Sequence, residues 1–270
     1  MEGERRPQQQ ANRATGREVH RGSETQDFAR LRPTQIVNGI EAGDIRDTGA
    51  VKVLVRQQLE LLQQTVHGAS RKELEGRYAP LVAGEPKALA RYCQQEADTA
   101  MSLNYTTESD FTDYPAAERW YEMAARFADE AAGVRTAADR PTPLRQAPVE
   151  QPTVPPAARA ETLLNGIEDG SITNPEAVHE TVGWLLETER QQLRSSELRR
   201  EREAAYAELI YGSPQVMVQF CLDEATARLG LDVPGSPHAN EEAAGHWYRM
   251  AARFARRAQE DRERGIGGIR

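Results

Sequence analysis

The sequence predicts an all-α protein: a tandem duplication of one four- to five-helix bundle module, with a Pro-rich linker between the copies. Three observations predict it. Blocks of residues recur in the same order at a nearly fixed offset, proline concentrates between the two sets of blocks, and apolar residues recur at helical spacing. No long stretch alternates apolar and polar residues, so nothing predicts a sheet.

The recurring blocks are collinear. The outer two recur at an offset of 127 residues and the middle one at 128, and the last pair is identical at eight of nine positions. Such order with a one-residue slip is improbable by chance and indicates duplication. The paired blocks are 38–45 and 165–172, 92–97 and 220–225, and 120–128 and 247–255.

Composition divides the chain into segments. Six prolines between 141 and 156 predict an extended, semi-rigid tether, so we expect the modules to fold independently and to survive a protease cut between them. The N-terminal segment holds few large apolar side chains and is expected to be disordered. The predicted segments are a polar tail over 1–29, module 1 over 30–134, the linker over 135–157, module 2 over 158–262 and a frayed tail over 263–270.

Capping and stop signals place the helices. Gly43 and Gly170 are predicted to end a short first helix. In module 2 a long helix is expected to run to about Ile210, whereas in module 1 its counterpart breaks near Gly68 and restarts at a capping box beginning at Ser70. The predicted helix starts in module 2 are Asn174-Pro175, Ser213-Pro214 and Ser236-Pro237.

Charge and hydropathy limit the classes of partner. The net charge is -8, and neither module is basic: 30–134 holds 16 acids and 12 bases, and 158–262 holds 18 and 12. Nucleic-acid binding normally needs a basic surface, so this balance argues against it. No apolar run approaches the ~18 residues of a membrane span, and no secretory signal is seen, so a cytoplasmic protein is expected.

The sequence offers no catalytic constellation. Residues that kept one chemistry in both copies should match, yet no histidine does. Cys93 and Cys221 therefore lack a shared base and are expected to be buried thiols. Glu96 and Glu224 match, but a carboxylate metal site would need further ligands such as Glu-x-x-His. We expect a protein that is not an enzyme and has no cofactor and no metal.

The last pair of blocks, 120–128 and 247–255, begins with Trp-Tyr in both copies, and this Trp-Tyr block predicts a deeply buried helix. At 100° per residue its apolar side chains, Trp120 and Phe127 among them, cover an arc of about 200°, wider than the stripe of an ordinary surface helix. Trp247 and Phe254 occupy the same positions in the second copy. We therefore expect these four side chains in the core, and the helix to contact neighbours on two sides.

Two arginines, Arg126 and Arg253, fall at the edge of this arc. Of the acids shared by both copies and preceding this helix, Glu96 and Glu224 are the nearer in sequence. We predict one ion pair per module, Glu96 with Arg126 and Glu224 with Arg253.

One loop has no counterpart in the second copy. It places Tyr105, Phe111 and Tyr114 among three acids. Aromatic side chains in a loop either fold back on the core or anchor a partner. The three residues are thus candidate partner contacts.

The function expected from these features is a non-enzymatic helical binding or scaffolding protein that contacts a protein partner. One alternative is a regulatory nucleic-acid-binding protein using the stretch 190–202, where five arginines alternate with glutamates. Another is a helical bundle that binds a small ligand in an apolar pocket.

Overall fold

The computed structural model describes residues 28–101, 112–133, 155–192, 196–211, 214–230 and 239–264. All the regular elements in these ranges are helices, which confirms the all-α prediction for them. The first half of the chain contains η1 (Phe28–Arg30), α1 (Pro33–Glu41), α2 (Thr48–Thr65), α3 (Ala69–Ala83), α4 (Pro86–Ala100) and α5 (Tyr114–Ala131). The second half contains α6 (Pro156–Glu168), α7 (Glu176–Gln192), α8 (Ser196–Tyr211), α9 (Pro214–Leu229) and α10 (Glu241–Glu263).

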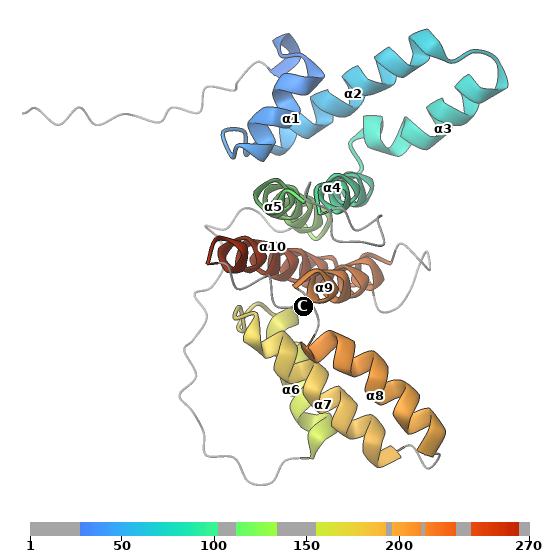
Figure 1. Ribbon diagram of the computed structural model, residues 1–270. Helices are drawn as coiled ribbons and strands as arrows, with labels where there is room; N and C mark the ends of the chain where they lie inside the picture. The colour runs from blue at the N-terminus through green and yellow to red at the C-terminus, as the bar shows by residue number, and fades with distance from the viewer. Residues whose placement is uncertain are drawn as a thin grey trace, which may run out of the picture.

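The helices stack in layers. The α4–α5 pair lies against the α9–α10 pair, α1 to α3 lie on the outer side of the first pair, and α6 to α8 lie on the outer side of the second (Figure 1). The most extensive helix contact in the described residues joins α5 to α10. Buried residues of both halves form one hydrophobic cluster. The halves therefore share a core, whereas the linker's composition led us to expect two independent modules. That each half survives a protease cut between them stays a prediction.

The Trp-Tyr helices α5 and α10 form the centre of this core. Trp120, Phe127, Trp247 and Phe254 are each at most 1% exposed, as the wide apolar arc predicted. α5 packs against α4 on one side and α10 on the other. The width of the arc thus has a structural cause: each helix buries one flank within its own half and the other against the opposite half.

The first helix of each half ends in the same way. Gly43 and Gly170 have φ of 80° and 75°, which confirms the predicted helix ends. The chain then returns, so that the Ile45 N–H donates to the Gly39 carbonyl oxygen at 2.8 Å. A Cβ on Gly39 would lie 2.6 Å from Ile45 Cδ1, so a side chain there would force Ile45 to shift. Ile172 and Gly166 repeat this contact at 2.7 Å.

Several predicted boundaries are wrong. The expected long helix of the second half is two helices, α7 and α8, which pack against each other. α3 begins at Ala69, with Gly68 at φ 66° before it, rather than at a Ser70 cap. Asn240 caps α10 by accepting a hydrogen bond from the Ala243 N–H at 3.1 Å, so this helix starts beyond Ser236 and Pro237.

The predicted tail and linker fall mostly outside the described residues. Phe28, placed in the disordered tail, is buried at 7% exposure and begins η1. Pro156 begins α6, so the last residues assigned to the linker are helical.

Candidate functional site

A groove of about 1290 Å³ lies between the α2–α3 hairpin and α4, and Leu229 and Gly230 of the second half also line it. α3 has no buried residue and contacts α4 only sparsely, so the hairpin projects from the body of the protein (Figure 1). One wall of the groove is apolar, and its side chains remain partly exposed to solvent. They are Leu61, Leu62, Leu74, Tyr78, Pro80, Leu81 and Ala88.

The α3 wall has helical order. Leu74, Tyr78 and Leu81 recur at i, i+4 and i+7 and are half-buried, so they form one stripe facing the groove. Leu61 and Leu62 of α2 are 53% and 37% exposed, two of the three exposed large apolar side chains in the described residues. Neighbouring apolar side chains left accessible to solvent are typical of a surface that binds another molecule.

The groove ends at a polar site on α4. The Tyr92 ring stands edge-on to the Trp120 ring, with centroids 6.4 Å apart, and its hydroxyl donates to Gln58 Oε1 at 3.0 Å. Glu96 is half-buried beside it. Burial raises the pKa of the Glu96 carboxyl, and the nearby Glu41 charge adds to this rise.

Glu41 completes the site. It is the residue just before the helix-ending turn of α1, and its Oε1 accepts a hydrogen bond from Trp120 Nε1 at 3.3 Å. Glu96 lines the groove, and Glu41 lies near enough for its charge to act on Glu96. Neither carboxylate has an ion-pair partner in the described residues, although Arg77, Lys87 and Arg91 line the groove elsewhere.

The second half has the same carboxylate pair with a cation in place. Arg228 contacts Glu168 Oε1 through Nε at 2.8 Å and through an Nη at 2.6 Å, and it reaches Glu224 Oε2 at 3.2 Å. Phe220 stands edge-on to Trp247 at 6.1 Å, as Tyr92 does to Trp120.

Glu168 is bound by Arg228, and the ring nitrogen of Trp247 is buried without a hydrogen-bond partner among the described residues. At the offset of 128 that relates the α4 and α9 blocks, Arg228 corresponds to Ala100. Ala100 lies one helical turn after Glu96, on the same side of α4. The first half thus keeps both glutamates and lacks the arginine.

The predicted ion pairs are wrong. Arg126 donates to the carbonyl oxygen of Arg46, and Arg253 donates to that of Thr173. Each arginine holds the loop that follows the first helix of its own half. The prediction failed because shared acids were the only acceptors considered, although a backbone carbonyl oxygen also accepts a hydrogen bond from a guanidinium group.

Both cysteines are buried, as predicted, with Cys93 and Cys221 fully inaccessible to solvent. Burial raises the pKa of each thiol well above its usual value, and the nearby glutamate adds to this. The thiols are therefore protonated and fill the core.

Of the three loop aromatics, Tyr105 and Phe111 lie outside the described residues. Tyr114 is the first residue of α5 and is 5% exposed. Its hydroxyl accepts a hydrogen bond from Gln215 Nε2 at 2.6 Å, so it joins the halves and is not an exposed partner contact.

A half-buried acid at the junction of the halves, Asp98, predicts a pH effect on stability. Burial raises the pKa of Asp98 to about 6; Tyr121 donates to it at 3.1 Å and works in the opposite direction. Its folded-state pKa exceeds its unfolded value, so its contribution to stability falls as the pH rises from about 4 to about 6. Asp98→Asn keeps the acceptor and should raise the free energy of unfolding by about 1–2 kcal/mol near neutral pH, with no gain near pH 4.

Urea unfolding of the wild type and Asp98→Asn at both pH values measures this difference. Asp223, whose charge also raises the Asp98 pKa, provides the comparison as Asp223→Asn, because it is exposed and should give a smaller gain. An equal gain from Asp98→Asn at both pH values would contradict the assignment.

Comparison with known proteins adds no relative: no family model, curated protein or solved structure matches the chain. None of the helices in the described residues is long and apolar enough to cross a membrane. The same residues contain no group of three or more His, Cys, Asp or Glu side chains placed to hold a metal ion.

Proposed function

We propose that this chain is a non-enzymatic helical binding protein, built by tandem duplication of one helical unit, whose first half holds a segment of a partner protein. The segment carries apolar side chains that lie in the groove and one arginine or lysine that reaches Glu96 and Glu41. The observation that carries the proposal is the contrast at one matched site: Arg228 lies between two glutamates in the second half, and Ala100 leaves the same pair without a cation.

Repeated contacts support the duplication. The Ile45–Gly39 backbone hydrogen bond recurs between Ile172 and Gly166. The arginine-to-loop contact, the edge-on aromatic pair and the capping of α5 by Asp113 recur at matched positions as well. These contacts lie in the same blocks that recur in the sequence.

Charge supports a cationic occupant. Burial and the Glu41 charge both disfavour ionised Glu96, and a bound cation would relieve both effects. An arginine fits best, since its planar guanidinium contacts two carboxylates at once, as Arg228 does with Glu168 and Glu224.

The nucleic-acid alternative loses part of its basis. Arg190, at the start of the arginine-rich stretch, pairs with Glu203 at 2.9 Å and with Glu187 at 3.6 Å. The Glu203 contact joins α7 to α8 and the Glu187 contact lies within α7, so at this position the arginine is paired with acids of its own helix pair.

Ala100→Arg tests the function because it places an arginine of the chain itself beside Glu96 and Glu41. The new side chain should bridge Glu96 and Glu41 and raise the free energy of unfolding by about 1 kcal/mol. It should also abolish capture of peptides selected on the wild-type chain from a displayed library of random helical peptides. Those peptides are expected to combine apolar residues at i, i+3 and i+4 with an arginine or lysine.

Thr99→Arg is the matched control, since it adds the same charge at the next residue of α4, on the exposed side. It should leave capture intact. Selected peptides without a basic residue, or capture that survives Ala100→Arg, would contradict the proposal. Binding of apolar small molecules in place of peptides would favour the ligand-binding alternative.

A further inference from the structure

A second hollow, of about 370 Å³, lies at the junction of the halves, where α5 meets α10. Its lining is strongly basic although the chain carries a net charge of -8. It contains five arginines, one acid and one alanine: Arg46, Arg126, Arg249, Arg253, Arg256, Glu122 and Ala252.

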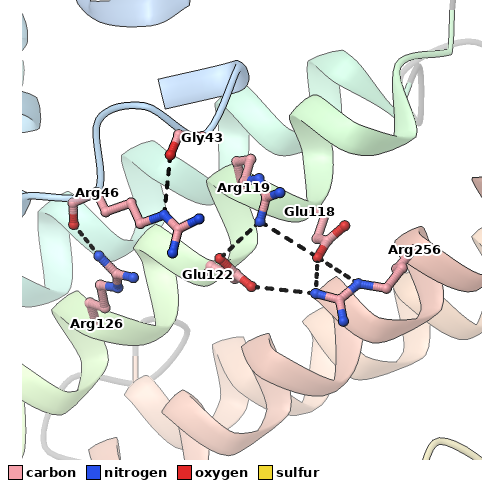
Figure 2. Close-up of polar contacts among 7 residues, drawn as sticks. All are labelled: Gly43, Arg46, Glu118, Arg119, Glu122, Arg126 and Arg256. Carbon is pink, nitrogen blue, oxygen red and sulfur yellow. Dashed lines mark hydrogen bonds and ion pairs between the residues drawn. The ribbon is translucent and has the colours of Figure 1, made fainter. Parts of the chain in front are cut away.

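Carboxylates neutralise two of the five arginines. Arg256 donates through Nε to Glu118 at 2.8 Å and lies 3.8 Å from Glu122, which Arg119 also approaches, at 3.6 Å (Figure 2). Arg249 pairs with Asp129. These contacts cross from α10 to α5 and help to hold the halves together.

The other three arginines contact only backbone carbonyl oxygens. Arg126 donates to the Arg46 carbonyl, and Arg46 donates through Nε to the Gly43 carbonyl at 3.1 Å (Figure 2). Arg253 donates to the carbonyl of Thr173. Within the described residues none of the three forms an ion pair, so three arginines that border the hollow have no acidic partner of their own.

The arginines also repel one another. Arg253 is half-buried, and its pKa is lowered first by burial and then by the charges of Arg249 and Arg256. Holding these cations together costs free energy, and an anion bound between them would offset that cost.

We propose that this hollow binds a small phosphate-bearing anion. Guanidinium groups favour tetrahedral oxyanions, because their planar N–H donors match two oxygens of one ligand. Each of Arg126 and Arg253 donates one hydrogen bond to a loop carbonyl and has further N–H groups for a ligand. The two residues are matched across the halves, on α5 and α10, so the anion bridges the halves and stabilises their junction. The groove and its partner play no part in this site.

Calorimetric titration of the full chain tests the proposal, with inorganic phosphate, pyrophosphate and ADP as probes at constant ionic strength. Phosphate alone distinguishes a free anion from ligands that need a phosphoester or diphosphate. Arg46→Gln should weaken binding about tenfold, the loss expected for one charge-assisted contact. Arg46 is exposed, so this variant should fold even if Arg253→Gln does not.

Two further variants sharpen the result. Glu122→Gln removes the only acid lining the hollow and should strengthen binding several-fold. Arg200→Gln is the control for Arg46→Gln, because it removes the same positive charge at an exposed residue of α8, and it should have no effect. The proposal is overturned if no probe binds, if sodium chloride stabilises the protein as well as phosphate does, or if Arg46→Gln and Glu122→Gln leave the affinity unchanged.

Discussion

Replacing either central tryptophan with alanine should lower the free energy of unfolding by about 3–5 kcal/mol, the range for large-to-small changes in a packed core. Trp120 and Trp247 are fully buried, and each stands edge-on to an aromatic ring of the neighbouring helix. Since the halves share one core, each substitution should shift a single unfolding transition of the whole chain. Urea unfolding followed by circular dichroism measures the loss.

The two tryptophans should differ when phenylalanine replaces them. Trp120→Phe also removes the hydrogen bond to Glu41 and should cost about 1 kcal/mol more than Trp247→Phe, whose ring nitrogen has no partner among the described residues. Trp184 is the control, because it is only half-buried under the Arg159 guanidinium, and Trp184→Ala should cost less than either core substitution. Equal losses for all three alanine variants would contradict this account of the core.

Sequence patterns predicted what depends on neighbours along the chain. The apolar arc of the Trp-Tyr helix fixes which side chains are buried, because helix geometry alone determines the arc. The left-handed glycines Gly43 and Gly170 end their helices where the block pattern placed them. Local signals failed where competing caps lay close together, as at Ser236 and Asn240.

Features that join distant segments were not predicted. The linker's composition suggested two separate bodies, yet α5 packs against α10 of the second half. The need for a second neighbour was visible in the sequence, because an apolar arc of about 200° is too wide for one neighbour to bury. The carboxylate site was also partly visible: Glu41 and Glu96 match Glu168 and Glu224, but the role of Arg228 required the folded chain.

Gly245→Leu should destabilise the whole protein by about 2–3 kcal/mol, the cost of overpacking a close contact between helices. Gly245 is buried on α10 at its contact with α5. A Cβ there would lie 2.7 Å from Asp129 Oδ1 and 3.3 Å from the backbone oxygen of Ala125. Asp129 is held by Arg249 and cannot easily move aside.

The variant therefore tests whether the halves form one cooperative unit. Other contacts cross the same junction, including Tyr248 to Gln94 at 2.9 Å and Lys87 to Glu241 at 2.5 Å, so both halves should lose stability together. Gly183→Leu is the matched control, because a Cβ at this α7 position meets no atom within 4 Å, and the substitution should be neutral or stabilising through helix propensity. Two separate transitions for Gly245→Leu, with only the second half weakened, would show that the halves fold independently, as the linker alone had suggested.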